Sequence, residues 1–183
     1  YLMRLPNILH ESVPVGVGDE GNEVLRTVGE RTKLSFTPKS HVDLIAELGV
    51  ADISRAAKTS GARFYFLKDE LVLLDYAVLR FALDFLRKKG FTLVEPPYLL
   101  LRNLYEGVTD LKEFEDVLYK IEGEELFLIS TSEHAIAAMH ADEIFEPGEL
   151  PKKYAGVSPC FRKEAGAHGK DSKGIFRVHQ FNK

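Results

Sequence analysis

The feature of the sequence that most constrains its fold is the last stretch, residues 156–183, which reads GVSPCFRKEAGAHGKDSKGIFRVHQFNK. Two runs with strand character, Ser158–Glu164 and Ile175–Phe181, flank a segment rich in glycine and lysine. Two such runs around a glycine-rich loop are typical of an antiparallel hairpin. We therefore expect a hairpin with a long, mobile, cationic tip, formed by Gly166, His168, Gly169, Lys170, Asp171, Ser172, Lys173 and Gly174.

Alternation along the two strands predicts one face of unusual composition. Side chains two residues apart on a strand point to the same side of the sheet, so each run places two charged or polar side chains and one other residue on one face. A guanidinium suits phosphate and an aromatic ring suits a base, so the face suits a nucleoside triphosphate. The alternative is a solvated charged face, because surface charge is common. The predicted face consists of Cys160, Arg162 and Glu164 from one run and Arg177, His179 and Phe181 from the other.

The wording of this hairpin resembles motif 2 of the class II aminoacyl-tRNA synthetases. That motif has an F-R-x-E strand, a variable loop and a second strand that carries Arg and Phe. The forms PCFR-x-EAG and R-x-HQF-x-K, read here from Pro159 to Lys183, resemble the seryl-tRNA synthetase family in particular. The resemblance implies an α+β fold, with an antiparallel β-sheet flanked by helices, as in part of a class II core.

The resemblance also implies roles for residues of the hairpin. Arg162 and Arg177 would be the catalytic residues, Arg162 on the α-phosphate of ATP and the attacking carboxylate, and Arg177 on the outer phosphates. Phe181 would lie under the adenine, and the backbone around Val178 would read its edge. Glu164 would contact adenine or the tRNA acceptor end. The expected ATP-binding residues are Arg162, Lys163, Glu164, Arg177, Val178 and Phe181.

A second candidate site lies where LISTSEHAIAAMH changes from strand to helix around residues 130–132. Ser130 and Glu133 fit a capping box, in which the two side chains satisfy exposed N–H groups of a first helical turn. The resemblance instead places Thr131, Ser132 and Glu133, with Arg162, in the pocket for serine. An ionised carboxylate pairs well with the ammonium of an amino acid. Both interpretations can hold at the same turn.

The clearest helix is predicted from about Asp69 to Lys89. Its apolar residues recur at helical spacing and extend most of the way round, which predicts a buried helix, including burial between subunits. A strand at Phe91–Glu95 and the pair Pro96-Pro97 follow. This unit resembles class II motif 1, which implies a homodimer built through residues 69–97. The alternative is an ordinary core helix with an edge strand.

The remaining chain supplies smaller elements. Residues 1–35 hold several glycines and prolines with little periodicity and are expected to form an extended leader, with a partial class II catalytic domain at 36–183. Within that domain we expect a short helix at Val42–Leu48, entered through Ser40 and closed by Gly49. Further expected elements are a strand at Arg63–Leu67, a weak helix at Asp110–Asp116 and a hairpin of Val117–Ile121 with Glu125–Ser130.

Composition limits the classes of function. A formal net charge of −4 over 183 residues argues against a general nucleic-acid binder. The single cysteine, Cys160, excludes an internal disulfide and fits a reducing cytoplasm. No apolar run approaches the length of a membrane span. His134 and His140 are six apart, which is not the spacing of a zinc pair, so we expect no metal site and interpret both as structural or surface residues.

The expected function is the serine–tRNA ligase reaction: ATP-dependent activation of L-serine to seryl-adenylate, followed by transfer to tRNA(Ser). The resemblance ends at Lys183, so we expect these residues to be a piece of a longer enzyme. The third class II motif, which would supply the Mg²⁺ ligands, and the arm that grips tRNA would then lie outside them. The alternatives are a ligase that loads an amino acid onto a carrier protein and a non-catalytic module that acts through dimerisation.

Overall fold

The computed structural model of the chain describes residue 5, residues 7–164 and residues 174–183. It divides into two compact units, Tyr1–Lys39 and Ser40–Lys183. In the first unit, the described residues are exposed and include one short 3₁₀ helix, η2 (Asp19–Gly21). The division into a leader and a catalytic domain at residues 35 and 36 stays a prediction. Residues 165–173, most of the predicted cationic tip, lie outside the described residues.

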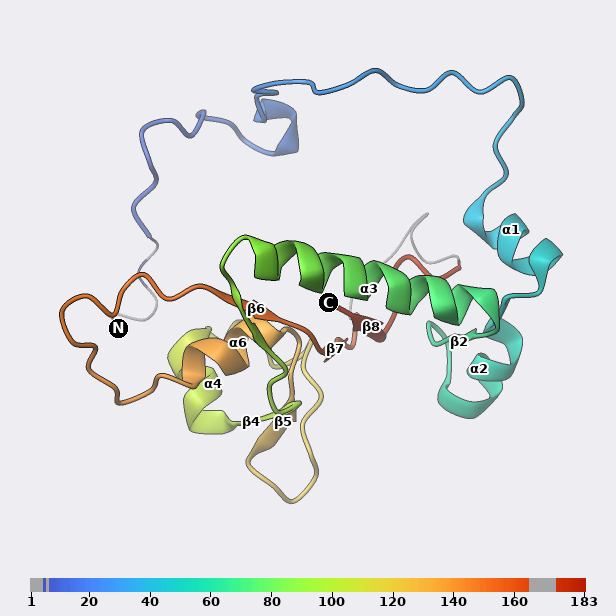
Figure 1. The fold of residues 1–183 in the computed structure, drawn as a ribbon. Coiled ribbons are helices and arrows are strands. Elements are labelled where there is room, and N and C mark those ends of the chain that lie inside the picture. Colours follow the sequence, from blue (N-terminus) through green and yellow to red (C-terminus); the bar gives the residue numbers. More distant parts are fainter. Residues whose placement is uncertain (1–4, 6, 165–173) are drawn as a thin grey trace. The chain divides into compact units, whose positions relative to one another are not determined.

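The second unit mixes helices with short strands (Figure 1). Its described helices are α1 (His41–Leu48), α2 (Ile53–Ser60), α3 (Glu70–Lys88), α4 (Arg102–Val108), α5 (Leu111–Phe114) and α6 (Ser132–Ala138). Its described strands are β1 (Ala51–Asp52), β2 (Phe66–Leu67), β3 (Thr92–Val94), β4 (Leu99–Leu101), β5 (Leu126–Leu128), β6 (Tyr154–Gly156), β7 (Pro159–Phe161) and β8 (Gln180–Asn182). No helix in the described part of the chain is long and apolar enough to cross a membrane.

The strands pair two by two. Antiparallel pairs join β1 to β2, β4 to β5 and β7 to β8. The α+β class with antiparallel pairing is thus confirmed, with one departure: β3 and β6 run parallel, with Thr92 opposite Tyr154. Parallel neighbours need a long crossover, and here the chain between them passes through α4, α5 and α6. The Phe161 N–H donates to the Ile129 carbonyl at 2.9 Å and so connects β7 to the end of β5.

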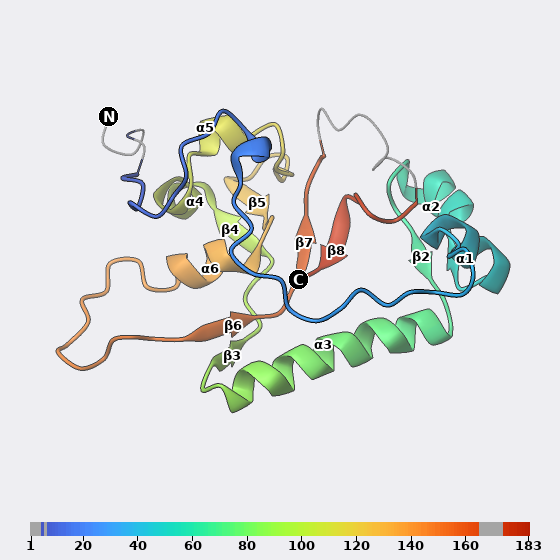
Figure 2. The ribbon, with the colours of Figure 1, turned by 90° about the horizontal axis from the view of Figure 1, so that it is seen from above.

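The hydrophobic core lies among α4, α6, β4 and β5. Tyr105, Phe127 and Ile129 are fully buried in it, and Leu118 nearly so. Large apolar side chains that leave water together supply most of the favourable free energy of such a unit. This core supports the strand-to-helix turn at residue 131 from below. Figure 2 shows β7 and β8 between this group of elements and the group formed by α1, α2 and β2.

The structure confirms three local predictions to different extents. The helix predicted at 42–48 is α1, with the Ser40 hydroxyl accepting from the Asp43 N–H and Gly49 closing it at a φ of 67°. The strand predicted at 63–67 is confined to Phe66–Leu67. Arg63 has a φ of 64°, a left-handed conformation that cannot continue a strand. The hairpin predicted at 117–130 forms in part: Lys120 bridges Phe127 and the Leu128 N–H donates to the Tyr119 carbonyl at 2.9 Å, while the other edge of β5 pairs with β4.

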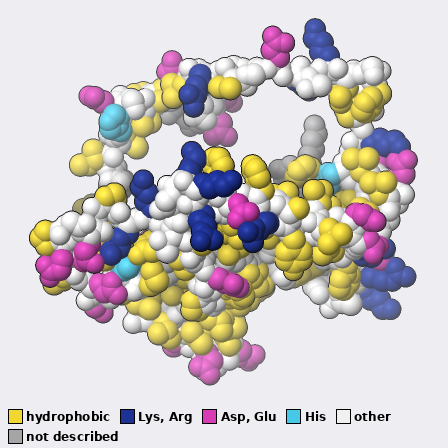
Figure 3. Space-filling view, viewed as in Figure 1, with side chains coloured by type: hydrophobic (Ala, Val, Ile, Leu, Met, Phe, Trp, Pro, Cys, Tyr) yellow, Lys and Arg dark blue, Asp and Glu magenta, His cyan; other side chains and the backbone are white. Residues whose placement is uncertain are grey.

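The prediction that the long helix is buried is wrong within this chain. No residue of α3 is buried, and Leu73 and Phe81 are 70% and 72% exposed. Figure 3 shows hydrophobic side chains gathered on the face of the molecule around α3. An apolar pattern tells which residues avoid water and does not tell what covers them, so the sequence could not distinguish cover by this chain from cover by another molecule.

Candidate functional site

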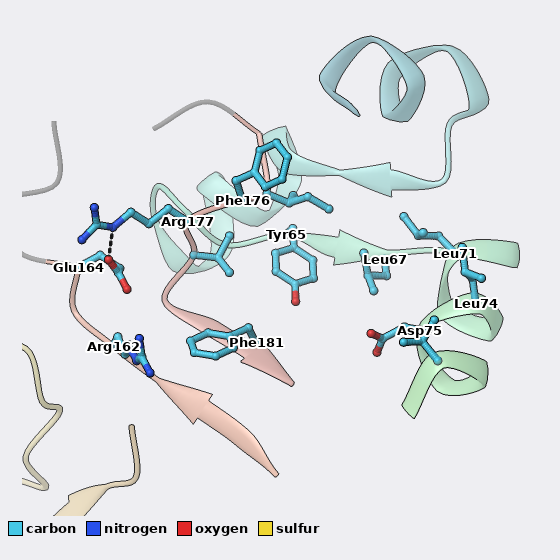
Figure 4. Close-up of a pocket in the computed structure, with 13 residues that line it drawn as sticks. Tyr65, Leu67, Leu71, Leu74, Asp75, Arg162, Glu164, Phe176, Arg177 and Phe181 are labelled. Atoms are coloured by element: carbon cyan, nitrogen blue, oxygen red, sulfur yellow. Dashed lines mark hydrogen bonds and ion pairs between the residues drawn. The ribbon is translucent and has the colours of Figure 1, made fainter. Parts of the chain in front are cut away.

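A cavity of about 630 Å³ lies between the β7–β8 hairpin, the region of β2 and the first half of α3. This volume is in the range of sites that take a nucleotide-sized ligand. Figure 4 shows Arg162, Glu164 and Arg177 on one side of it, Phe181 and Tyr65 in the middle, and Asp75 on the α3 side. Its lining residues are Tyr65, Leu67, Leu71, Leu74, Asp75, Val78, Arg162, Glu164, Ile175, Phe176, Arg177, Val178 and Phe181.

The antiparallel register brings the predicted face together. Cys160 lies opposite Phe181 in the β7–β8 pair, and the same register places Arg162 and Glu164 against residues 179 and 177. Five of the predicted ATP-binding residues therefore line the cavity: Arg162, Glu164, Arg177, Val178 and Phe181. Lys163 does not, because alternation turns its side chain away, and its ammonium lies 6.0 Å from the centre of the Tyr119 ring. Cys160 is fully buried beneath this face.

The two arginines are held differently. The guanidinium of Arg162 lies 5.1 Å from the centre of the Phe181 ring, and its Nε donates to the Ser130 carbonyl at 3.3 Å. Arg177 forms an ion pair with Glu164, whose carboxylate is nearly buried. The Phe181 ring and the Ser130 carbonyl thus orient the Arg162 side chain, whereas the Arg177 side chain is held at the cavity by the Glu164 carboxylate. A fork of donors in these positions is suited to phosphate oxygens.

His179 does not share the cavity face with Arg177 and Phe181, which corrects the sequence-based interpretation. The strand β8 begins only at Gln180, so strict alternation does not extend back to residue 179. The His179 ring stacks on Phe64, with 5.0 Å between ring centroids, and its Nδ1 lies 2.8 Å from the Tyr119 hydroxyl. The imidazole therefore lies behind the hairpin, away from the cavity lining.

The second predicted site forms the start of α6. Thr131 is the N-cap, and its hydroxyl accepts from the Glu133 N–H at 3.4 Å. The capping box predicted on Ser130 and Glu133 is therefore wrong by one residue. The Ser130 hydroxyl lies in the core, 3.2 Å from the Tyr105 hydroxyl, and the Glu133 side chain is 73% exposed. The Glu133 carboxylate is thus available for another partner.

That partner is Lys183. Its ammonium donates to Glu133 Oε1 at 2.7 Å and to the Thr131 hydroxyl at 3.0 Å. This hydrogen bond and the charge of Lys183 lower the pKa of the Glu133 carboxyl, with a smaller contribution from Arg162. Glu133 and Thr131 together therefore bind an ammonium group in this structure. Ser132 is buried, and a Cβ built on Gly156 would lie 2.5 Å from its hydroxyl, so that hydroxyl packs against β6.

Sequence reasoning missed several residues of the site. Tyr65, the residue before β2, and Asp75 of α3 line the cavity, and Asp75 accepts from the Asn182 side chain at 2.8 Å. Burial, and secondarily Asp75, raises the pKa of Tyr65. Lys183 is the last residue of the R-x-HQF-x-K pattern. Its contact with Glu133, which lies 50 residues earlier in the chain, is visible only in the three-dimensional structure. Nothing in the local sequence around residues 65 and 75 indicates a ligand site.

The described residues contain no group of three or more His, Cys, Asp or Glu side chains placed to hold a metal ion. Asp75 and Glu164, the carboxylates that line the cavity, are bound to Asn182 and Arg177. These residues do not form a Mg²⁺ site by themselves.

The chain is similar to known proteins both in sequence and in fold. Residues 115–183 match the family described as tRNA synthetase class II core domain (G, H, P, S and T). The whole chain aligns with the serine–tRNA ligase of Methanoregula boonei at 62% identity, covering 43% of that protein. The chain thus spans less than half the length of the curated relatives it matches.

Two solved structures also match over the whole chain. The seryl-tRNA synthetase of Pyrococcus horikoshii complexed with ATP has a TM-score of 0.94 at 53% identity, with 45% of its chain covered. The cytoplasmic serine–tRNA ligase of Naegleria fowleri in complex with AMP has a TM-score of 0.93 at 41% identity, with 44% covered.

Proposed function

The chain belongs to the class II aminoacyl-tRNA synthetases, in their seryl-tRNA synthetase form, and we propose that it supplies the part of the catalytic domain that activates L-serine with ATP. The names of the relatives favour this function over the two alternatives, loading of a carrier protein and a module without catalysis. The structures of relatives with ATP and with AMP support a nucleotide in the cavity between the hairpin and α3.

The main support for the proposal is the position of Arg162, whose side chain contacts both candidate sites. Its side chain lines the cavity beside Phe181, while its Nε is bonded to Ser130, the residue before Thr131. A guanidinium in this position can contact a nucleotide phosphate and an amino acid carboxylate at the same time. No other cation lines this cavity on the side of Ser130 among the described residues.

In the proposed reaction, an oxygen of the serine carboxylate attacks the α-phosphorus of ATP. A new O–P bond forms, the bond from that phosphorus to the bridging oxygen breaks, and pyrophosphate leaves with the electron pair. Negative charge grows on the phosphoryl oxygens, so fixed cations lower the barrier. Arg162 would hold the α-phosphate and the carboxylate, and Arg177 would exchange Glu164 for the outer phosphates.

Serine itself would be held by its ammonium. Thr131 and Glu133 already bind the ammonium of Lys183, and a substrate ammonium offers the same charge and the same donors. Phe181 and the backbone at Val178 would receive the adenine. Ser132 and Lys163 remain weaker candidates, since their side chains pack against β6 and over Tyr119.

We extend the proposal to the partners of the whole protein. The seryl group would pass to the terminal hydroxyl of tRNA(Ser), with Mg²⁺ bound by residues outside this chain, in the cytoplasm. The exposed apolar face of α3 would be covered by a second copy through residues 69–97. Serine-dependent ATP–pyrophosphate exchange tests the central claim. It should be measured with a protein of the relatives' length that carries this sequence, with threonine and alanine as control substrates. Equal exchange with all three would overturn it.

A further inference from the structure

The β7–β8 ladder is interrupted at the residue pair that carries the site. In an antiparallel ladder, opposite residues of a hydrogen-bonded pair exchange two N–H···O bonds. Ser158 and Lys183 do so, at 3.2 and 3.0 Å. Arg162 and His179 form the corresponding pair at the other end, but only the Arg162 N–H donates to the His179 carbonyl, at 2.9 Å. The His179 N–H donates instead to the Arg63 carbonyl, at 3.1 Å.

The imidazole of His179 replaces the missing bond. Its Nδ1 lies 2.8 Å from the Arg162 carbonyl oxygen. A carbonyl oxygen only accepts, so this hydrogen bond requires the proton on Nδ1. The Tyr119 hydroxyl lies 2.8 Å from the same nitrogen, and with the proton on Nδ1 it is a second acceptor. Stacking on Phe64 holds the plane of the ring.

The backbone held in this way carries the side chains that face the cavity. The Lys163 N–H donates to the Val117 carbonyl at 2.8 Å, and Arg63 Nη1 donates to the Glu164 carbonyl at 2.9 Å. The segment from Arg162 to Glu164, which follows the end of β7, is thus held by hydrogen bonds with Val117, His179 and Arg63. Arg162 is the first residue after β7, so these hydrogen bonds to the backbone, rather than the strand ladder, determine where its side chain starts.

We propose that His179 is a positioning residue for Arg162, and that its Nδ1–H sets the place of the guanidinium through the Arg162 carbonyl. This inference rests on the proposed function, because the effect on reaction is an effect on the group that contacts the α-phosphate. His179 itself lies outside the cavity lining, so its role would be to position Arg162 and not to bind substrate. Displacement of a catalytic group by less than an ångström lowers the rate of the chemical step more than it lowers ground-state binding.

Two matched substitutions separate the hydrogen bond from the ring. The side-chain amide nitrogen of asparagine reaches the place of Nδ1, whereas that of glutamine reaches the place of Nε2. In a protein of the relatives' length, His179→Asn should keep kcat for serine-dependent pyrophosphate exchange within about 3-fold, and His179→Gln should lower it about 10-fold or more. The KM for ATP should change less than about 3-fold in both, since the residue positions rather than binds. Equal kcat values for the two variants would overturn the proposal.

A measurement without activity tests the contact itself. Imidazole ¹⁵N chemical shifts of the unsubstituted 183-residue chain should assign the proton of neutral His179 to Nδ1, and an Nε2–H tautomer would overturn the proposal even if a variant fails to fold. If the unsubstituted long protein shows no serine-dependent exchange, the proposed function fails, and with it the catalytic meaning of the contact. An Nδ1–H tautomer in that case would still support the bond to Arg162.

Discussion

The ammonium of Lys183 lies 2.7 Å from Glu133 Oε1, so the carboxylate proposed to bind serine already holds a cation. Glu133→Gln should therefore weaken serine binding about 10-fold or more, the usual effect of removing the charged partner of an ammonium. ATP binding should change little, because Glu133 does not line the nucleotide cavity. The measurement is KM for each substrate in the exchange assay.

Thermal unfolding of the same variant gives the complementary result. Since Thr131 is the N-cap and Glu133 is mostly exposed, stability should stay within about 0.5 kcal/mol of the unsubstituted protein. The matched control is Glu125→Gln, which removes an exposed carboxylate paired with Lys120 and Arg102 away from both sites. Equal losses for serine and ATP, together with a large loss of stability, would favour a structural role for Glu133.

The sequence predicted the cavity face better than its surroundings, for a physical reason. Alternation with a period of two is a local property, and it correctly grouped Arg162, Glu164, Arg177 and Phe181. It failed at His179 because the second strand is irregular before Gln180, where the ladder bond goes to Arg63.

The remaining errors depend on tertiary structure. Serine is a common N-cap residue, but the Ser130 hydroxyl is hydrogen-bonded to Tyr105 in the core, and Thr131 is the N-cap of α6 instead. The contact of Lys183 with Glu133 joins two segments that no local pattern relates. The exposure of α3 could not be predicted either, because hydrophobicity alone does not tell which molecule provides the cover.

A second prediction concerns Arg162. In the long protein, Arg162→Lys should lower serine-dependent exchange about 100-fold or more, since an ammonium cannot reach two oxygens as a planar fork does. The matched control, Arg102→Lys, alters a guanidinium that pairs with Glu106 and Glu115 on the surface, and exchange should stay within about 3-fold. Similar rates for the two variants would remove Arg162 from the α-phosphate role.

A third prediction tests the packing that holds the start of α6. A Cβ on Gly156 would lie 2.5 Å from the Ser132 hydroxyl oxygen and 2.7 Å from Ile136 Cδ1, so Gly156→Ala should destabilise the chain by about 1–3 kcal/mol. Gly107→Ala is the control, because nothing lies within 4 Å of its Cβ position in α4, and it should stabilise by about 0.5–1 kcal/mol. Urea unfolding of both variants measures the difference, and a neutral Gly156→Ala would mean that β6 and α6 are not in contact.

A fourth prediction concerns pH and His134, whose Nδ1 lies 3.1 Å from the Tyr105 hydroxyl. Burial lowers the pKa of His134 below its ordinary value of 6.5, with Lys183 and Arg162 acting in the same direction and Glu133 opposing them. Between the lowered pKa and 6.5 the unfolded chain binds more protons at this residue than the folded chain does, so stability falls as pH falls through this window.

The unfolding free energy of the His134→Gln variant should therefore depend less steeply on pH between about 5 and 7 than that of the unsubstituted chain. His10→Gln, at an exposed residue of the first unit, should leave the slope unchanged. Identical slopes for all three proteins would show that the partial burial of His134 does not lower its pKa in the folded chain.

The last prediction concerns the exposed face of α3. Leu73, Tyr76 and Phe81 are each at least 65% exposed, and contiguous apolar surface of this kind is rarely left in water by a soluble protein. The 183-residue chain should therefore sediment as a dimer or a larger assembly, through residues 69–97. The double substitution Leu73→Glu and Phe81→Glu should shift it to a monomer, because burying two carboxylates in an apolar contact is unfavourable. Ile144→Glu places one carboxylate on an exposed apolar residue outside α3 and should leave the assembly intact. A monomer in the unsubstituted chain would contradict the proposed interface, and dissociation by Ile144→Glu alone would move it to another surface.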